Sequence, residues 1–309
     1  MKYAIMGAGA VGGYFGARLA AGGDEVVFIA RGAHREAMRR DGLKVFSPLG
    51  DVHIEAPDVM DDPGDVGLCD IVLFCVKLWD VAAAAETIKP LLSRDCAVVP
   101  LQNGVTVEDQ LSDILGAEHV MGGVCKLSVS IESPGVIRHH GDFAWLGFGE
   151  RGGAPTWRQE CLHAACLGAG INVDSSRAIE AHIWEKFVFL APFAGATSFY
   201  RTPAGQIMAD PEKRARFEAM VRETAAVGRA KGVALPDDLE ARTLAFVASS
   251  PPAMTASMAN DLDAGRRLEL EWLSGEVARL GQELGVDTPE NAAVYEALKP
   301  HAMGKAPVS

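Results

Sequence analysis

The chain has 309 residues, of which 49% are hydrophobic and 23% are charged, a composition typical of a globular protein with room for two domains. Its net charge of −12 disfavours a nucleic-acid or anionic-membrane surface as the main function, although it is compatible with a local basic pocket. The six cysteines form no C-x-x-C pair and no metal-ligand spacing, so we expect reduced thiols and no metal. The chain starts with a predicted strand rather than a signal-peptide pattern, so we expect a cytoplasmic location.

The first element is the apolar run over residues 2–6, which predicts a buried strand, and a glycine-rich turn follows it directly. That turn has the pattern G-x-G-x-x-G and consists of Gly7, Ala8, Gly9, Ala10, Val11 and Gly12. A helix is predicted over 11–21, so its N-terminal N–H groups and dipole would face a bound pyrophosphate. Strand, glycine turn and helix in this order are typical of dinucleotide-binding proteins. We therefore predict that these six residues bind a dinucleotide cofactor; the alternative is an ordinary glycine-rich loop.

The second predicted strand, over 25–30, ends at a residue that bears on which cofactor is bound. An acidic residue at this position would bind the ribose 2′-hydroxyl of NAD, whereas Arg31 suits the 2′-phosphate of NADP. We therefore expect NADP(H), with Arg31 at the 2′-phosphate. The alternative is that Arg31 is a solvated surface charge, like the basic residues that follow it on a predicted polar helix over 33–40.

Strands and helices continue to alternate along the next part of the chain. The predicted elements are a hairpin with strands over 43–46 and 52–54, a buried strand over 71–76, a helix over 79–88, a buried strand over 97–101 and a helix over 108–115. Continuous apolar strands of this kind belong to parallel sheets that are covered on both faces. Their alternation with helices predicts a doubly wound, Rossmann-like α/β sheet.

Polar residues follow two of these buried strands. Lys77 comes after the strand over 71–76, and Asn103 comes shortly after the strand over 97–101. Because ligands of such sheets bind at the carboxyl ends of the strands, we expect Lys77 to add charge at the cofactor site. We likewise expect Asn103 to bind the nicotinamide ribose or the substrate. The alternatives are an exposed loop lysine and an asparagine that fills an Asn-Gly turn.

The pattern changes twice in the rest of the chain. Short strands are predicted over 124–131, 136–139 and 144–148, then a helix over 157–167 and a strand over 171–173. We expect these strands to complete the sheet in antiparallel fashion. Beyond residue 175 the chain reads as helices broken by prolines. The predicted fold is therefore an N-terminal Rossmann-like domain over 1–175 that binds NADP, followed by an all-α C-terminal domain over 176–309.

One predicted helix of the second half, over 177–199, carries a lysine between apolar faces. At helical spacing Lys186 shares a face with Ile183 and Leu190, while the opposite face, which includes Phe187, is apolar as well. A helix that is apolar on both sides is buried. Lys186 must then extend to the surface, pair with a carboxylate or titrate with a lowered pKa, and a lysine of the last kind in a cleft can act as a general acid.

A carboxylate that could orient Lys186 lies in the segment over 266–271. Helical spacing would place Glu269 beside Trp272 and so bury it in part, yet Glu276 falls on the same side. The pattern alone therefore favours a solvated helix charge at Glu269 over a site residue.

Taken together, these motifs resemble those of the ketopantoate reductase (2-dehydropantoate 2-reductase) family, and the resemblance extends over nearly the whole chain. The matching motifs are the glycine turn over 7–12, the strand that ends in Lys77, Leu101-Gln102-Asn103-Gly104, Trp184-Glu185-Lys186, Ser257-Met258, and Glu269 followed by Ser274-Gly275. The glycine turn is shared by many dehydrogenases, whereas the ordered set is specific.

The resemblance implies a role for each matching site residue. Lys186 would be the proton donor, Asn103 would contact cofactor and substrate, Ser257 would contact the carboxylate region of the substrate, and Glu269 would be a catalytic residue beside the nicotinamide. The implied reaction is the NADPH-dependent reduction of 2-dehydropantoate to pantoate, a step of pantothenate (coenzyme A) biosynthesis. Hydride would go to the C2 ketone while Lys186 protonates the oxygen.

The chain departs from the family at two positions. The better-studied family members carry asparagines one and two helical turns after the catalytic lysine, where this chain has Leu190 and Ala194. A pocket without those amides should select its substrate differently, because hydrogen-bonding sites discriminate strongly. The alternatives are therefore a reductase of a different 2-oxo acid and a non-catalytic NADP(H)-sensing protein. The expected partner is a small 2-oxo acid, with no nucleic acid or membrane, and a homodimer is a further possibility.

Overall fold

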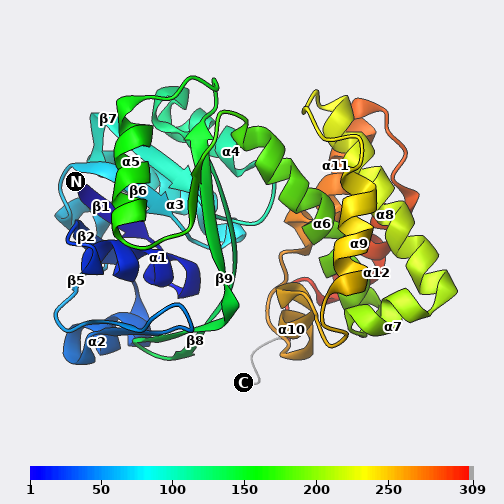
Figure 1. The fold of residues 1–309 in the computed structure, drawn as a ribbon, viewed down its shortest axis with the longest axis horizontal. Helices are drawn as coiled ribbons and strands as arrows, with labels where there is room; N and C mark the ends of the chain where they lie inside the picture. Colours follow the sequence, from blue (N-terminus) through cyan, green and yellow to red (C-terminus); the bar gives the residue numbers. More distant parts are fainter. Residues whose placement is uncertain (306–309) are drawn as a thin grey trace. The chain divides into compact units, whose positions relative to one another are not determined.

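The computed structural model describes residues 1–305, and the chain divides into two compact units (Figure 1). The N-terminal unit comprises residues 1–102 and 106–179, and the C-terminal unit comprises residues 103–105 and the chain from Glu180 onward. The short segment 103–105 therefore belongs, by its contacts, to a unit whose other residues come much later in the sequence.

A parallel sheet forms the centre of the N-terminal unit. Its five strands lie in the order β5-β2-β1-β6-β7. They are β1 (Lys2–Met6), β2 (Glu25–Ile29), β5 (Asp58–Met60), β6 (Cys69–Phe74) and β7 (Leu92–Pro100). All neighbouring pairs run parallel, which confirms the predicted doubly wound sheet, although the short edge strand β5 was not predicted. The chain order reverses between β1 and β6, the place where ligands bind in such sheets.

Helices pack against this sheet and bury its apolar side chains. They are α1 (Ala10–Ala21), α2 (Gly32–Asp41), α3 (Val81–Ile88), α4 (Val107–Leu115) and α5 (Trp157–Gly168). The core includes Tyr3, Ile5 and Phe28 from the strands and Phe15 from α1, all fully buried. Gly16 allows α1 to approach β1 and β2 closely, because a Cβ at Gly16 would lie 2.6 Å from the Phe28 ring.

A second sheet contains the strands after residue 120 together with the early hairpin. Its strands are β3 (Leu43–Phe46), β4 (Val52–Ile54), β8 (Met121–Ser133), β9 (Val136–Glu150) and β10 (Val173–Ser175). β9 pairs antiparallel with β8 and parallel with β3 and β10. A parallel bridge between Val98 and Val120 joins the two sheets. The prediction that these strands complete the first sheet in antiparallel fashion was therefore wrong.

β9 is also one strand where two were predicted. Leu127 pairs with Ala144 and Ser128 pairs with His140, so residues 141–143 bulge out of the ladder. A polar stretch that resembles a turn in the sequence is thus accommodated as a bulge within one continuous strand.

The described part of the C-terminal unit is helical, and no strand is described after Ser175, as the sequence predicted. Its helices are α6 (Ile179–Tyr200), α7 (Ala204–Ala209), α8 (Pro211–Ala230), α9 (Leu239–Ser249), α10 (Ser257–Asp263), α11 (Ser274–Leu284) and α12 (Pro289–Leu298). Pro211 and Pro289 occupy the first turns of their helices, where the missing N–H has no intrahelical partner. Over residues 1–305, no helix combines the length and apolarity needed to cross a bilayer.

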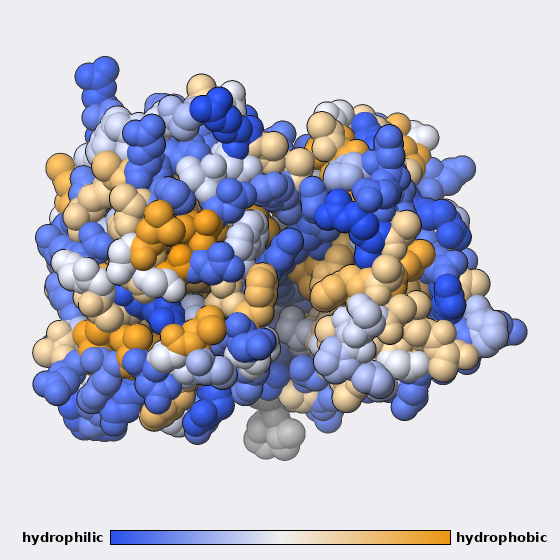
Figure 2. Space-filling view, in the orientation of Figure 1, coloured by the Kyte–Doolittle hydropathy of each residue, from blue (hydrophilic) through white to orange (hydrophobic). Residues whose placement is uncertain are grey.

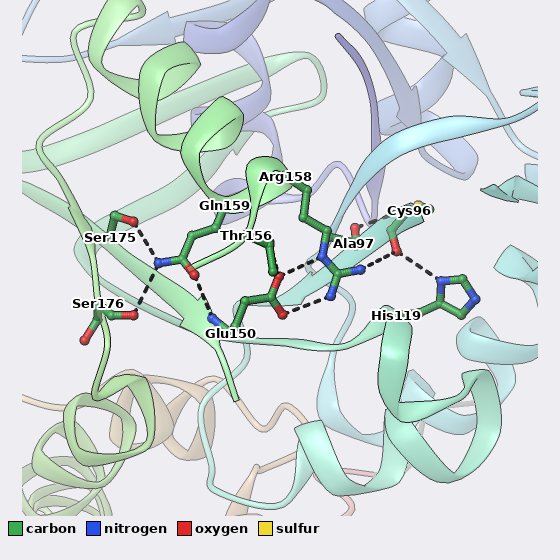
Figure 3. A network of polar contacts seen from close by, with 9 residues as sticks. All are labelled: Cys96, Ala97, His119, Glu150, Thr156, Arg158, Gln159, Ser175 and Ser176. Atoms are coloured by element: carbon green, nitrogen blue, oxygen red, sulfur yellow. Dashed lines mark hydrogen bonds and ion pairs between the residues drawn. The ribbon is translucent and has the colours of Figure 1, made fainter. Parts of the chain in front are cut away.

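A polar network ties α5 to the strands of the N-terminal unit (Figure 3). The Arg158 guanidinium donates to both carboxylate oxygens of Glu150 at 2.8 and 2.9 Å, and to the Cys96 carbonyl oxygen at 3.2 Å. Gln159 accepts from the Glu150 backbone N–H at 3.0 Å and donates to Ser175 at 2.8 Å. Burial acts to raise the pKa of Glu150, but the side-chain hydrogen bonds from Arg158 and Thr156 outweigh the effect of burial and hold that pKa below its usual value.

The face drawn in Figure 2 carries hydrophobic residues as small patches among hydrophilic ones. Over the described chain, the exposed large hydrophobic side chains include Leu68, Leu167 and Met303, which are far apart in the sequence. Scattered apolar side chains of this kind are ordinary on protein surfaces.

Candidate active site

The glycine turn over 7–12 follows β1, and among its three glycines only Gly9 has open space beside its backbone. Gly7 has a φ of +90°, and a Cβ there would lie 2.9 Å from the backbone nitrogen of Val76. A Cβ at Gly12 would lie 2.4 Å from the Gly7 carbonyl oxygen, so both glycines are needed for close packing. At Gly9, in contrast, a Cβ would meet no atom within 4 Å. The turn is therefore tight against the protein and open at Gly9, a geometry that suits a pyrophosphate.

Two predicted cofactor residues follow the strands on either side of β1. Arg31 comes after β2 and precedes α2; its side chain is 80% exposed and its guanidinium lies 3.7 Å from the Asp80 carboxylate. Lys77 follows β6 and is exposed, with its ammonium 5.7 Å from the centre of the Trp79 ring. An exposed, long ion pair contributes little stability, so the Arg31 side chain can turn toward a ligand at low cost.

Three of the predicted site residues meet within the C-terminal unit. The Lys186 ammonium donates to Asn103 Oδ1 at 3.0 Å, and Asn103 Nδ2 donates to Glu269 Oε2 at 3.1 Å. Both contacts fit one orientation of the amide, since its oxygen accepts from the cation and its nitrogen donates to the carboxylate. The result is a chain of hydrogen bonds from an ammonium through a neutral amide to a carboxylate.

These three side chains come from segments that are distant in the sequence. Lys186 lies on α6 and is half-buried. Asn103 follows β7 and precedes Gly104, whose φ of +121° is a conformation that favours glycine. Glu269 is 8% exposed and directly precedes a short 3₁₀ turn over Leu270–Trp272. The fold therefore brings together three groups that lie far apart in the chain.

The expectation that Glu269 is a solvated helix charge was wrong. α10 ends at Asp263, and Glu269 lies in an irregular segment before the 3₁₀ turn, so helical spacing does not apply to it. The backbone N–H of Leu268 donates to the Ala302 carbonyl oxygen at 2.9 Å, which attaches this segment to the end of the described chain. A long-range contact of this kind leaves no periodic signal in the sequence.

The remaining predicted residues stand apart from this chain of hydrogen bonds. Ser257 is the first residue of α10, and its side chain is exposed. Leu190 and Ala194 follow Lys186 by one and two turns of α6; Leu190 is half-buried and Ala194 is 1% exposed. The helix face that continues from Lys186 is therefore apolar at these two positions. Residues 1–305 contain no group of three His, Cys, Asp or Glu side chains that could hold a metal ion.

A pocket at the last turn of α6, within the C-terminal unit, was not predicted from the sequence. Its lining includes Ser198, near the end of α6, and Arg201, which lies just beyond that end. No spacing pattern reveals it, because its lining combines the end of α6 with α10 and the loop before α10.

Comparisons with known proteins give consistent results over both units. The model of "Ketopantoate reductase PanE/ApbA" matches residues 3–153, and that of "Ketopantoate reductase PanE/ApbA C terminal" matches residues 178–302. The chain is 30% identical to the uncharacterized oxidoreductase YkpB of Bacillus subtilis, over 97% of this chain and 98% of that protein. It is also 30% identical to the 2-dehydropantoate 2-reductase of a Nostoc species, over 96% and 94%. The crystal structure of a PanE/ApbA family ketopantoate reductase from Ralstonia eutropha aligns with a TM-score of 0.90 at 34% identity, over 98% of each chain.

Proposed function

Because the chain belongs to the ketopantoate reductase family of oxidoreductases, we propose that it reduces the C2 ketone of a small 2-oxo acid with NADPH. Residues 1–175 would bind the dinucleotide, and residues 176–309 would supply the catalytic lysine and most of the substrate pocket. The observation that carries this proposal is the chain of hydrogen bonds from Lys186 through Asn103 to Glu269. The first candidate substrate is 2-dehydropantoate, whose reduction to pantoate belongs to pantothenate biosynthesis.

The N-terminal residues suit the cofactor in three respects. The glycine turn over 7–12 is open at Gly9, where backbone N–H groups can approach a pyrophosphate. Arg31 is exposed at the end of β2, where a guanidinium can pair with a 2′-phosphate in a forked geometry. Lys77 adds a positive charge after β6. When bound, NADPH supplies the hydride for the reaction.

Lys186 would act on the oxygen of the ketone. An ammonium has three N–H groups, and the contact with Asn103 uses one of them, so two can be donated to the substrate. Negative charge develops on the oxygen as hydride adds to carbon, and the ammonium stabilises it and then transfers a proton to it. Proton transfer by a positioned side chain contributes roughly 10²- to 10⁴-fold to the rate.

Asn103 and Glu269 would hold Lys186 in position for this step. The Glu269 carboxylate accepts from the Asn103 amide and so fixes the amide with its oxygen toward Lys186. Glu269 is buried, which makes the orientation it imposes well defined. Asn103 has a second amide N–H that can bind cofactor or substrate, and Ser257 at the start of α10 can bind the substrate carboxylate.

A second candidate function is the reduction of a 2-oxo acid with a more apolar side chain. Leu190 and Ala194 favour it, because neither side chain can hydrogen-bond a hydroxyl group of 2-dehydropantoate. A hydrophobic pocket discriminates weakly against an added hydroxyl, so both acids could be turned over with different efficiencies.

Steady-state oxidation of NADPH with a panel of 2-oxo acids tests the proposal. We expect turnover that falls by roughly 10²-fold or more in Lys186→Ala. The matched control is Lys213→Ala, which removes a lysine on α8 and should retain activity. A low KM for 2-dehydropantoate would support the first candidate, and a lower KM for an apolar 2-oxo acid would support the second. If the chain binds NADPH and turns over none of the acids, the proposal fails and an NADP(H)-sensing protein replaces it.

A further inference from the structure

His34 is a half-buried histidine of the N-terminal unit that the proposed reaction does not use. It lies in the first turn of α2, three residues after Arg31. On one side it contacts the turn between β8 and β9, where the Gly135 backbone N–H donates to His34 Nδ1 at 3.1 Å. This turn lies close against α2, since a Cβ at Gly135 would be 3.2 Å from the Cβ of Ala37. The imidazole is therefore held between α2 and a turn from a distant part of the sequence.

The contact with Gly135 fixes which imidazole nitrogen carries the hydrogen. A backbone N–H is a donor, so Nδ1 of His34 must be the acceptor, and the neutral ring carries its hydrogen on Nε2. Burial is the larger of two opposing effects on the pKa of His34 and lowers it, which favours this neutral form. Nε2 is itself buried and makes no hydrogen bond within the described part of the chain. Because buried polar groups are almost always paired, this N–H requires an acceptor.

The acceptor that the structure offers is the Ala8 carbonyl oxygen of the glycine turn. Ala8 is 2% exposed, and its carbonyl oxygen accepts no backbone hydrogen bond from residues 1–305. This oxygen lies close enough to the imidazole of His34 to act on its pKa, in the raising direction expected when an N–H group faces an oxygen. A buried donor and a buried acceptor thus lie near each other without a complete hydrogen bond, and a small rotation of the Ala8 peptide group would form one.

The same turn also contacts the helix that follows the glycine motif. Ile137, two residues after Gly135, packs on Gly13 in the first turn of α1, where a Cβ would lie 2.2 Å from Ile137 Cδ1. The segment 135–137 therefore contacts both His34 and the start of α1. This packing keeps the imidazole and the glycine turn in one rigid neighbourhood.

We propose that His34 is a positioning residue for the dinucleotide, whose Nε2–H bonds to the Ala8 carbonyl oxygen when the glycine turn binds the pyrophosphate. The Ala8 carbonyl and the Gly9 N–H belong to one planar peptide group, so a donor at the oxygen fixes the plane at the open position of the turn. This inference rests on the proposed function, because it needs a dinucleotide at the turn. Arg31 would bind the 2′-phosphate, whereas His34 would act on the part that NADPH and NADH share.

Two amide substitutions separate the roles of the two imidazole nitrogens. His34→Asn places an amide oxygen where Nδ1 was, so it keeps the acceptor for Gly135 and loses the donor toward Ala8. His34→Gln places an amide N–H where Nε2 was, so it keeps the donor toward Ala8 and loses the acceptor for Gly135. His53→Asn is the matched control, because it changes an exposed histidine on β4 of the same unit.

Fluorescence titration of the full chain with NADPH and with NADH measures affinity, and thermal unfolding without cofactor measures stability. His34→Asn should raise the Kd for both cofactors by the same factor, roughly three- to tenfold as expected for one hydrogen bond, and should keep the Tm of the parent chain. His34→Gln should bind both cofactors within about twofold of the parent chain and lower the Tm by about 2 to 4 °C, because the Gly135 N–H loses its acceptor. His53→Asn should change neither quantity. A merely structural role for His34 would move affinity and Tm in the same direction.

The outcomes distinguish this inference from the proposed function. If the parent chain binds NADPH and His34→Asn binds it as tightly as His34→Gln does, the inference is overturned and the proposed function stands. The inference is also overturned if His34→Asn unfolds at a lower temperature than His34→Gln, or if His34→Asn weakens the binding of NADPH and not of NADH. A parent chain that does not bind NADPH overturns both.

Discussion

Replacing Asn103 by alanine should disconnect Lys186 from Glu269 with little loss of buried volume. The change removes two hydrogen bonds, one from the Lys186 ammonium at 3.0 Å and one to the Glu269 carboxylate at 3.1 Å. Each involves a charged group, and such bonds contribute about 1.5 to 3 kcal/mol. If the loss of one of these bonds raises the activation free energy by the same amount, kcat should fall roughly 10- to 150-fold, since each 1.36 kcal/mol is tenfold in rate.

The assay is steady-state NADPH oxidation with the best 2-oxo acid, and it measures kcat and KM separately. Gln102→Ala is the matched control: it removes the neighbouring amide, which donates to the Phe74 and Val76 carbonyl oxygens at 2.9 and 3.1 Å. The Gln102→Ala variant should lower the free energy of unfolding and leave kcat nearly unchanged. An Asn103→Ala enzyme whose kcat and kcat/KM both equal those of the parent chain would refute the reasoning.

Asn103→Asp gives an independent test of the same contact through pH. The introduced carboxylate can still accept from Lys186 but faces the Glu269 carboxylate, and two like charges at hydrogen-bond distance raise the pKa of one of them. One shared proton restores the bond between the two carboxyl groups at low pH. Activity relative to the parent chain should therefore recover as the pH falls from 8 to 5, and a flat ratio over that range would contradict the geometry.

Three further changes test the cofactor site and the stability of the N-terminal unit. Arg31→Asp should lower kcat/KM for NADPH about 10²-fold more than for NADH, as expected for losing a 2′-phosphate contact, whereas Arg39→Asp on α2, the helix that Arg31 precedes, should not. Burial raises the pKa of Glu108 in the folded state to about 7, so the free energy of unfolding should fall as the pH rises from 4.5 to 7. Glu108→Gln removes the buried charge and should therefore raise the Tm at pH 8 and not at pH 4. Arg158→Met removes the cationic partner of the buried Glu150 carboxylate, which then keeps only the side-chain hydrogen bond from Thr156, and should cost about 3 kcal/mol in urea unfolding at pH 7. Because the Glu150 pKa is lowered in the folded state, that cost should shrink below pH 4; an unchanged cost would contradict the pairing.

The parts of the fold that the sequence predicted are those with strong local signals. Most of β6 and the second half of β7 are continuous apolar runs, and the length of such a run predicts a buried parallel strand without knowledge of its neighbours. The first half of β7 contains Ser93, Arg94 and Asp95 and was not predicted as strand. β5 has only three residues in the structure, and such a short strand gives no recognisable pattern. β9 was divided into two because a bulge and a turn have the same polar composition, and only its pairing with β8 distinguishes them.

The candidate site was only partly predictable, for a related reason. Lys186 stands out because a lysine between apolar helix faces is unusual, and this signal is local. Glu269 looks like a solvated helix charge in the sequence, whereas in the structure it is buried, its amide partner is Asn103, and the preceding Leu268 is bonded to Ala302. Periodicity describes a residue's own element, whereas the environment of Glu269 is set by segments far away in the chain.

Residues 103–105 belong, by their contacts, to the C-terminal unit. The segment follows β7 directly, so its sequence position suggests a residue of the dinucleotide-binding sheet. Its contacts are instead with Lys186 and Glu269, and all three residues belong to one compact unit. The contacts that orient the ammonium therefore lie within that unit. The preceding residue, Gln102, donates to carbonyl oxygens at the end of β6 and just beyond it, so adjacent residues anchor the same chain segment to each unit. A substitution at Asn103 should accordingly lower the rate of the chemical step, whereas a substitution at Gly9 should act chiefly on the affinity for NADPH.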